Sequence, residues 1–398
     1  MALITIWKSN PDAVLSMTIQ QIVATAGNGN LRDSSDCSNE LREFLSQVEG
    51  EQLGIFADHC LTQSFEKSGM VLQDIVNELG RRLEYIVENG RYQGSSSSVG
   101  HDGLWRSPEG HSLVVEVKTT DAFRLRLDTI AGYREKLREQ GSLLEPSSML
   151  IIVGREDTGE LEAQVRGSRH AWDMRLISVE SLIHLVKLKE TTDEPLTGSK
   201  IRSVLIPREY TRLDALIDII FTAAKDVEAG VEEVEQPKET EEESSGWEFT
   251  DRTLLDSKRA EIISAFASQE QVSLIKRSRA LSWTSDHRFR VGCTISKRYG
   301  KEVGSTLYWY AYHPRWDDFL GAGEVGYLIL GCMDLAVAFA IPVEIIRQRQ
   351  DELNLTHLPG GKSYWHLKII EQATGYALQM PRTGNHLPLG EYAFACSR

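Results

Sequence analysis

The chain has 398 residues, 41% hydrophobic and 26% charged, a composition typical of a soluble globular protein with two or more domains. Its formal net charge is −14. No apolar run approaches the roughly 20 residues that span a bilayer, and the first residues lack the pattern of a secretory signal. We therefore expect a cytoplasmic protein with no membrane partner. The five cysteines never form a Cys-x-x-Cys pair, which argues against a disulfide framework and a cysteine zinc site.

The negative charge is concentrated in one segment. Residues 226–251 hold eleven acids and one lysine, a charge of −10, which leaves only −4 for the rest of the chain. Acidic charge mixed with Pro, Ser and Gly predicts an acidic linker over residues 225–250. Residues 252–398 contain eighteen Lys/Arg and fourteen Asp/Glu, and this mildly basic part is compatible with a nucleic-acid partner.

Helical periodicity dominates the start of the chain. Apolar residues recur at helical spacing over residues 17–27 and 39–65, which predicts a helical N-terminal extension over residues 1–65. A further long helix is predicted over residues 70–90, where Asn-Gly provides a C-terminal stop.

The pattern then changes to strands alternating with helices. Two strands flank a Ser-Pro-Glu-Gly turn signal and are followed by helix, strand, helix, strand and helix: 99–105, 112–118, 127–141, 148–154, 159–173, 174–179 and 180–190. This order predicts an α/β domain over residues 66–224 with a mixed sheet flanked by helices. The strand-rich part after the linker predicts a separate α+β recognition or sensing domain over residues 251–398.

The second strand of the predicted hairpin carries a pair of charged side chains. Because side chains alternate along a strand, Glu116 and Lys118 project from one face and Val117 from the other. If the turn centres on Glu109, Asp102 lies opposite Glu116 with Cβ atoms about 5 Å apart. Carboxylates so close repel each other unless a cation lies between them. Oxygen ligands favour Mg²⁺, or Mn²⁺ in its place, and the lysine can stabilise negative charge developing on a phosphate.

These residues resemble the PD-(D/E)XK nuclease superfamily, to which many restriction endonucleases belong. The resemblance rests on Asp102 and on Glu116-Val117-Lys118 at the end of a hairpin with a helix on either side, and it covers roughly residues 65–190. It implies a restriction-endonuclease-like fold and Mg²⁺-dependent hydrolysis. It also implies Asp102, Glu116 and the Val117 carbonyl as metal ligands, with Lys118 beside the water or phosphate.

Members of the superfamily often add an acid from the preceding helix. Glu78 is our choice for this fourth catalytic residue, with Asp74 one turn earlier as its competitor and Gln73 behind it. The sequence departs from the pattern at His101, where the superfamily name has proline. That position is tolerant in the superfamily.

Several polar residues near the pair are candidates for contact with nucleic acid. Thr119 and Thr120 follow the lysine and either line the substrate groove or cap the next helix. Gln164, Arg166 and Arg169 lie on one predicted helix and either meet phosphates or form an ordinary solvated helix face.

Two groups of aromatic residues leave alternatives open. Tyr133, on the helix after the hairpin, either lines the groove or belongs to an ordinary helix face. A dense group in the C-terminal part forms either core or a surface for base stacking, and its members are Tyr308, Trp309, Tyr310, Tyr312 and Trp316.

The expected function is that of a metal-dependent endonuclease that hydrolyses phosphodiester bonds, in DNA rather than RNA. The family resemblance implies a restriction or anti-phage defence effector. A homodimer is expected because cutting a duplex requires two sites, and the C-terminal domain could take an activating partner or ligand. The alternatives are a catalytically inactive nuclease-like binding or regulatory protein, and a structure-specific DNA repair nuclease.

Overall fold

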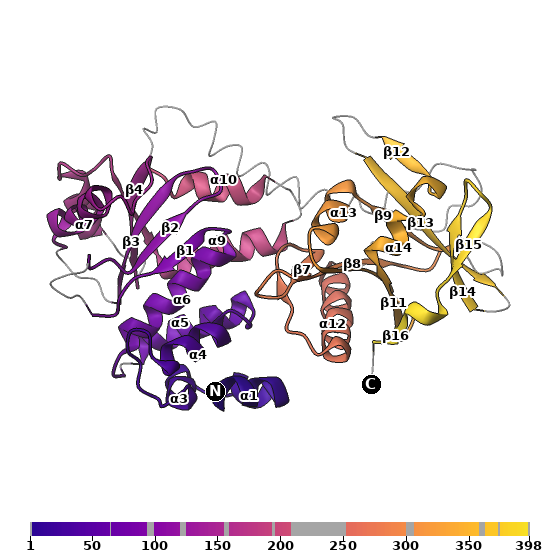
Figure 1. Ribbon diagram of the computed structural model, residues 1–398, viewed down its shortest axis with the longest axis horizontal. Coiled ribbons are helices and arrows are strands. Elements are labelled where there is room, and N and C mark those ends of the chain that lie inside the picture. Colours follow the sequence, from indigo (N-terminus) through magenta and orange to yellow (C-terminus); the bar gives the residue numbers. More distant parts are fainter. Residues whose placement is uncertain are drawn as a thin grey trace. The chain divides into compact units, whose positions relative to one another are not determined.

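The structure is a computed structural model that describes residues 2–63, 65–93, 99–119, 125–154, 159–192, 196–207, 252–299, 306–357, 363–372 and 375–396. It divides into two compact units, Met1–Glu228 and Ala229–Arg398 (Figure 1). The division falls within the predicted acidic linker, and that linker lies outside the described residues. Among the described residues, none of the helices combines the length and the apolar character needed to cross a membrane.

Five helices open the N-terminal unit: α1 (Ala2–Ser9), α2 (Pro11–Leu15), α3 (Ile19–Thr25), α4 (Asp36–Leu45) and α5 (Gly50–Thr62). Thr18 and Gln21 form a capping box at the start of α3, and Ser35 caps α4. The predicted helix over 39–65 is interrupted between α4 and α5. Apolar side chains of these helices share one core with the following helix and the sheet, so they are an integral part of the α/β unit.

Helix α6 (Ser68–Arg82) is shorter than the sequence predicts. The prediction of helix to residue 90 is wrong beyond Arg82, because Glu84 has a left-handed backbone (φ 67°) and Ile86–Asn89 form strand β1. The β-branched residues Ile86 and Val87 favour a strand, and β1 pairs antiparallel with β2. The chain therefore enters the sheet one strand earlier than expected.

A five-stranded mixed sheet follows, in the order β1-β2-β3-β4-β5. Its further elements are β2 (Gly103–Arg106), β3 (Ser112–Lys118), α7 (Leu127–Glu139), β4 (Ser147–Val153), α8 (Gly159–Arg166), β5 (Met174–Ser178), α9 (Val179–Thr191) and α10 (Thr197–Val204). Strands β2 and β3 are antiparallel, whereas β3, β4 and β5 run parallel. The predicted hairpin register is confirmed, since Gly103 pairs with Val115 and Arg106 with Ser112. The general α/β class is confirmed as well.

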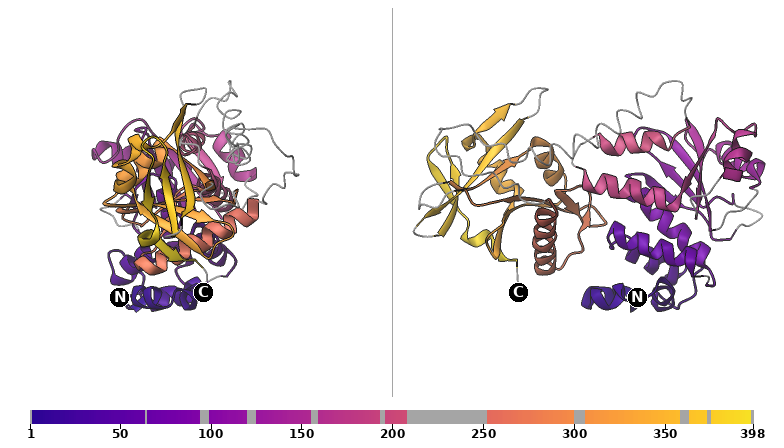
Figure 2. Two further views of the ribbon diagram at one scale, coloured as in Figure 1. Left: turned by 90° about the vertical axis from the view of Figure 1, so that its right-hand side faces the viewer. Right: turned by 180° about the vertical axis from the view of Figure 1, so that it is seen from behind.

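Helices cover both faces of this sheet (Figures 1 and 2). Trp105 and Val115 point into a core shared with α5, α6 and α9. Leu104 and Val114 point into a second core shared with α7 and α8. Because alternate residues face opposite sides, Glu116 belongs to the face that α7 covers.

The C-terminal unit contains two sheets, drawn from orange to yellow in Figure 2. One has the order β16-β11-β10-β8-β7-β6, and in the other β12-β13-β14-β15 is joined by β9, which pairs with β13. The elements are α12 (Arg252–Glu270), β6 (Ile275–Lys276), β7 (Leu281–Trp283), β8 (Phe289–Ser296), β9 (Thr306–Tyr312), α13 (Pro314–Gly321), β10 (Val325–Cys332), β11 (Val337–Pro342), α14 (Val343–Arg347), β12 (Leu355–His357), β13 (Ser363–Gln372), β14 (Gly375–Met380), β15 (Asn385–Pro388) and β16 (Ala393–Ala395). This unit is α+β in its organisation.

Candidate active site

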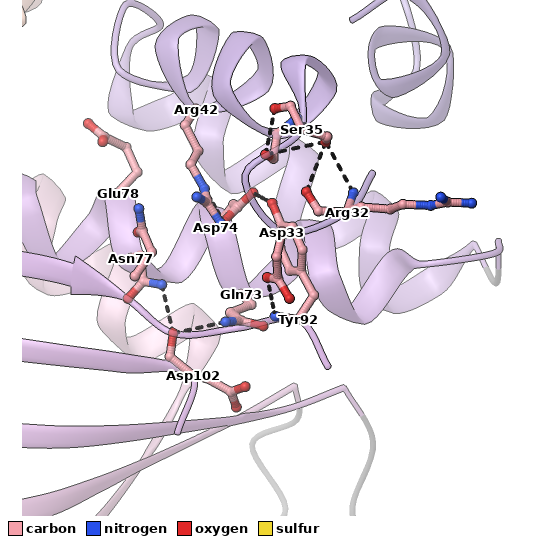
Figure 3. Close-up of polar contacts among 12 residues, drawn as sticks. Arg32, Asp33, Ser35, Arg42, Gln73, Asp74, Asn77, Glu78, Tyr92 and Asp102 are labelled. Carbon is pink, nitrogen blue, oxygen red and sulfur yellow. Dashed lines mark hydrogen bonds and ion pairs between the residues drawn. The ribbon is translucent and has the colours of Figure 1, made fainter. Parts of the chain in front are cut away.

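Helix α6 fixes the backbone of Asp102 just before β2. The carbonyl of Asp102 accepts hydrogen bonds from Gln73 Nε2 (3.0 Å), Asn77 Nδ2 (2.9 Å) and the Gly90 N–H (2.9 Å). Its own N–H donates to the Val115 carbonyl at 3.0 Å. Figure 3 shows the consequence: the carbonyl faces Asn77 and Gln73, and the carboxylate turns away from them. Gln73, a candidate for the fourth site residue, instead holds the backbone of Asp102 through this hydrogen bond.

The side chains of Asp102, Glu116 and Lys118 lie at the end of β3. Asp102 Oδ2 accepts the Val117 N–H at 2.7 Å. In an extended strand the N–H and C=O of one residue point to the same edge, so the Val117 carbonyl also faces the edge that Asp102 occupies. Lys118 Nζ lies 2.5 Å from Glu116 Oε1. Glu116 Oε2 is buried and has no hydrogen-bond partner among the described residues.

The pKa values of Asp102, Glu116 and Lys118 are shifted by burial and by neighbouring charges. Burial raises the pKa of Asp102 to about 7, and the charge of Glu116 adds to this, while the Val117 N–H and Lys118 counteract it only in part. Burial also raises the pKa of Glu116, against the opposing effect of Lys118. Burial alone would lower the pKa of Lys118, but the neighbouring carboxylates raise it above its usual value. The site therefore holds a protonated lysine beside two carboxyls that are reluctant to ionise together.

Tyr133 of α7 lies close enough to this pair to feel its charge. Its pKa is raised by burial and by the charge of Glu116, so its hydroxyl is within electrostatic reach of the carboxylates. A Cβ added at Gly100 would lie 3.2 Å from the Tyr133 hydroxyl oxygen. Tyr133 therefore lies near the carboxylates on the α7 side of the sheet.

The structure does not bring Glu78 to the carboxylate pair. Glu78 Oε1 accepts from Arg82 Nε at 2.8 Å, and its other oxygen lies 3.4 Å from Arg81. Helix α6 packs on the opposite face of the sheet from Glu116, so an acid pointing into that helix layer cannot join the site. Figure 3 shows the Glu78 carboxylate well away from that of Asp102. We therefore correct the assignment of Glu78 as a fourth catalytic acid.

Asp74, the competitor of Glu78, has a structural role. Its fully buried carboxylate accepts from Arg42 Nε at 2.8 Å and from the Tyr92 hydroxyl. These contacts tie α4 and the segment after β1 to α6 (Figure 3). Burial raises the pKa of Asp74, and Arg42 opposes that rise.

The candidates for nucleic-acid contact are only partly brought to the site. Both amide atoms of Gln164 bind the backbone of Leu125, so this side chain holds the segment before α7. Arg169 follows the end of α8, which is shorter than predicted, and pairs with Asp128 at 2.8 Å. Arg166 is exposed at the end of α8 and has no ion-pair partner among the described residues.

The residues after Lys118 are described only in part. Thr119 is half-buried directly beyond the strand, and the side chain of Thr119 lies 3.5 Å from where a Cβ on Gly69 would be. Thr120 lies outside the described residues. Thr119 therefore borders the segment between β3 and α7.

The ligand set of the pair is small. Within the described ranges, no group of three or more His, Cys, Asp or Glu side chains is arranged to hold a metal ion. Asp102 and Glu116 offer two carboxylates, and the Val117 carbonyl would be the third oxygen.

No protein-family model matches this sequence, and comparison with curated proteins gives no significant match. A functional assignment therefore depends on the geometry of the residues themselves.

Proposed function

We propose that the N-terminal unit is a Mg²⁺-dependent nuclease of the PD-(D/E)XK type that hydrolyses phosphodiester bonds in DNA. The observation that carries the proposal is the position of Asp102 beside the end of β3, where its carboxylate accepts the Val117 N–H and its pKa is raised by the charge of Glu116. Lys118 follows on the same face, where it pairs with Glu116. Two neighbouring carboxylates, with a lysine two residues after one of them on the same strand, form the minimal set for metal-assisted phosphodiester hydrolysis.

The residues fit a divalent cation. Glu116 Oε2 is a buried oxygen without a hydrogen-bond partner among the described residues, and Lys118 offsets only part of the rise in the pKa of Asp102 that burial and Glu116 cause. Asp102, Glu116 and the Val117 carbonyl would hold the ion through oxygen, which suits Mg²⁺ or Mn²⁺. Such an ion supplies Lewis acidity and a bound water of lowered pKa.

Each side chain contributes a separate function in this proposal. Lys118 is held in its charged form, because the carboxylates raise its pKa, so it acts on the phosphate as a cation and hydrogen-bond donor. The Val117 N–H orients the carboxylate of Asp102 through its 2.7 Å hydrogen bond. Tyr133 lies within electrostatic reach of the pair on the α7 side.

The surrounding architecture is consistent with a restriction-endonuclease-like fold. The mixed sheet has helices on both faces (Figure 1). The carboxylate pair lies at the end of β3, the central strand of the five. On this basis we propose a restriction or anti-phage defence effector that acts as a homodimer, with the C-terminal unit recognising the target or an activator. One observation favours an inactive, binding-only protein: the direct Lys118–Glu116 ion pair is also what a purely structural hairpin would contain.

A cleavage assay distinguishes the two. Wild type, Asp102→Asn and Lys118→Met are incubated with supercoiled plasmid, single-stranded DNA and RNA in Mg²⁺, Mn²⁺ or EDTA. We expect cleavage of DNA by wild type in Mg²⁺ or Mn²⁺ only, and a loss of at least about 100-fold in both variants, because each removes charge stabilisation of the transition state. Equal cleavage by all three proteins, or cleavage in EDTA, would reject the proposal.

A further inference from the structure

The second sheet of the C-terminal unit has a buried face and an aromatic outer face. Tyr308, Tyr310 and Tyr312 of β9 are 0–2% exposed and point into the core, as the core alternative for this group predicts. Trp309 has the opposite orientation and is half-buried. On β13, Leu367 points inward, and Tyr364, His366 and Lys368 share the outer face with Trp309.

Three rings on this outer face contact one another. The ring centroids of Trp309 and Tyr364 are 6.0 Å apart, those of Trp309 and His366 are 5.7 Å apart, and those of Tyr364 and His366 are 5.0 Å apart. Trp309 belongs to β9, and Tyr364 and His366 belong to β13, which pairs with β9 and lies beside it in Figure 1. We call Trp309, Tyr364 and His366 the ring cluster.

The polar edges of the ring cluster are satisfied within the sheet. Trp309 Nε1 donates to His366 Nδ1 at 3.0 Å, so His366 carries its proton on Nε2, which lies 2.6 Å from Thr356 Oγ1. The imidazole is thereby held neutral, and burial and the nearby Lys368 both lower the pKa of His366. All three residues are half-buried, so part of each remains exposed, and with these polar edges used a flat group would contact the rings through their faces.

The charge around the ring cluster is positive. Lys368 is the cross-strand neighbour of Trp309 and has no ion-pair partner among the described residues. The registers of β12 to β15 place no carboxylate on the outer face among the described positions. Its other residues are Thr306, Ala311, Thr356, Ile370, Gln372, Gly375, Ala377, Gln379, His386 and Pro388, of which Ile370 and Ala377 are buried. A face with clustered aromatic rings, in edge-to-face and tilted contact, and a lysine without an ion-pair partner among the described residues is complementary to an anionic chain that carries flat groups.

We propose that the ring cluster binds single-stranded nucleic acid, with unpaired bases stacked on Trp309 and Tyr364 and a backbone phosphate at Lys368. Bases paired within a duplex do not present their faces, so duplex DNA is not the ligand of this surface. Neither Asp102 nor Glu116 takes part, so the inference goes beyond the proposed nuclease activity and stands or falls separately from it.

The test is binding by full-length protein in EDTA, with Asp102→Asn as the background so that cleavage cannot interfere. Fluorescein-labelled dT20, U20 and a 20-base-pair duplex serve as probes at several salt concentrations. Trp309→Leu and Lys368→Gln are compared with Trp172→Leu, a matched control because Trp172 is 69% exposed and lies in the other unit. Circular dichroism confirms that each variant is folded.

We expect dT20 or U20 to bind at least about 10-fold more tightly than the duplex, because base stacking on an aromatic ring contributes about 1–3 kcal/mol per base. Trp309→Leu should weaken binding by about 10-fold, and Trp172→Leu should leave it unchanged. Lys368→Gln should reduce the slope of log affinity against log salt by about 1. No binding of either single strand, tighter binding of the duplex, or unchanged affinity in Trp309→Leu would overturn the inference. If Trp309→Leu does not fold, Tyr364→Leu makes the same comparison.

Discussion

Asp102 and Glu116 each make the ionised form of the other less favourable, and burial adds to the effect. The pKa of Asp102 is about 7, against an ordinary value of 3.8. The folded protein therefore binds this proton more tightly than the unfolded chain does. A cation held between the carboxylates would reverse this preference, which couples metal binding to pH.

Stability should depend on pH through Asp102. Because its pKa is raised in the folded state, the free energy of unfolding should fall as pH rises from about 4 to about 7 and then level off, by at most about 1.4 kcal/mol per pH unit. Asp102→Asn keeps an acceptor for the Val117 N–H and removes the charge, so this fall should be reduced in the variant. Urea denaturation in EDTA between pH 4 and pH 8 measures both. Parallel curves for wild type and Asp102→Asn would contradict the assignment.

Glu78 should matter for stability and not for chemistry. Its ion pair with Arg82 is buried, and removing one partner of such a pair typically costs about 3–5 kcal/mol. Glu78→Gln should therefore destabilise the N-terminal unit while it leaves the cleavage rate per folded molecule within about twofold of wild type. Denaturation and cleavage are measured on the same preparation. A folded Glu78→Gln protein without cleavage activity would show that Glu78 is a catalytic residue.

At the scale of elements, α6 and the hairpin position the site together. Asn77 donates to the Asp102 carbonyl and accepts from Trp105 Nε1 at 2.9 Å, so a single side chain links helix, strand and site. Gly80 allows this close packing, because a Cβ there would lie 2.6 Å from the Trp105 ring. The distance between α6 and β2 is therefore set by a glycine against a tryptophan.

A pair of glycine substitutions tests this packing. Ala is the better helix former by about 1 kcal/mol, so Gly132→Ala in α7, where nothing lies within 4 Å of the added Cβ, should stabilise the protein slightly. Gly80→Ala should instead destabilise it by about 1–3 kcal/mol, because the ring of Trp105 must move. Thermal denaturation of both variants decides the point. Equal effects would show that α6 does not pack closely on β2.

The sequence predicted the hairpin well because turn length and strand alternation are local properties. They predict the register of β2 and β3, which is confirmed from Gly103–Val115 to Arg106–Ser112. Asp102 lies just beyond this paired stretch, where its N–H donates to the Val115 carbonyl. The position of Glu78 could not be predicted in the same way, since helical spacing does not say which face of a sheet a helix will cover. Strand β1 was missed because the apolar spacing of its four residues continues that of α6, and only the left-handed backbone at Glu84 separates them.

The C-terminal unit shows the same limit. The density of aromatic residues in β9 left a core position and a stacking surface as alternatives. Because alternate residues of a strand face opposite sides, some of these residues are in the core and another is on the outer face. Tyr308, Tyr310 and Tyr312 are core, and Trp309 lies on the outer face. Its contact with His366 joins residues 57 positions apart, and no local pattern in the sequence reports such a contact.

At the scale of the whole molecule, the chain has two units with separate cores. Ligands that bind one unit should therefore stabilise that unit alone. We expect calorimetry to show two unfolding transitions, of which Mg²⁺ raises only one, and we expect Asp102→Asn to abolish that shift. A single transition, or a shift of both, would mean that the units do not unfold independently.

We propose above all that Asp102 and Glu116 form a metal site, and Mn²⁺ binding tests this without knowledge of the substrate or the activator. Electron paramagnetic resonance of free Mn²⁺ at pH 8 counts the ions bound by wild type, Asp102→Asn, Glu116→Gln and Glu78→Gln. We predict at least one site in wild type and in Glu78→Gln, and the loss of that site in the other two variants. The account is contradicted if wild type binds no Mn²⁺, or if Asp102→Asn and Glu116→Gln bind as much as wild type.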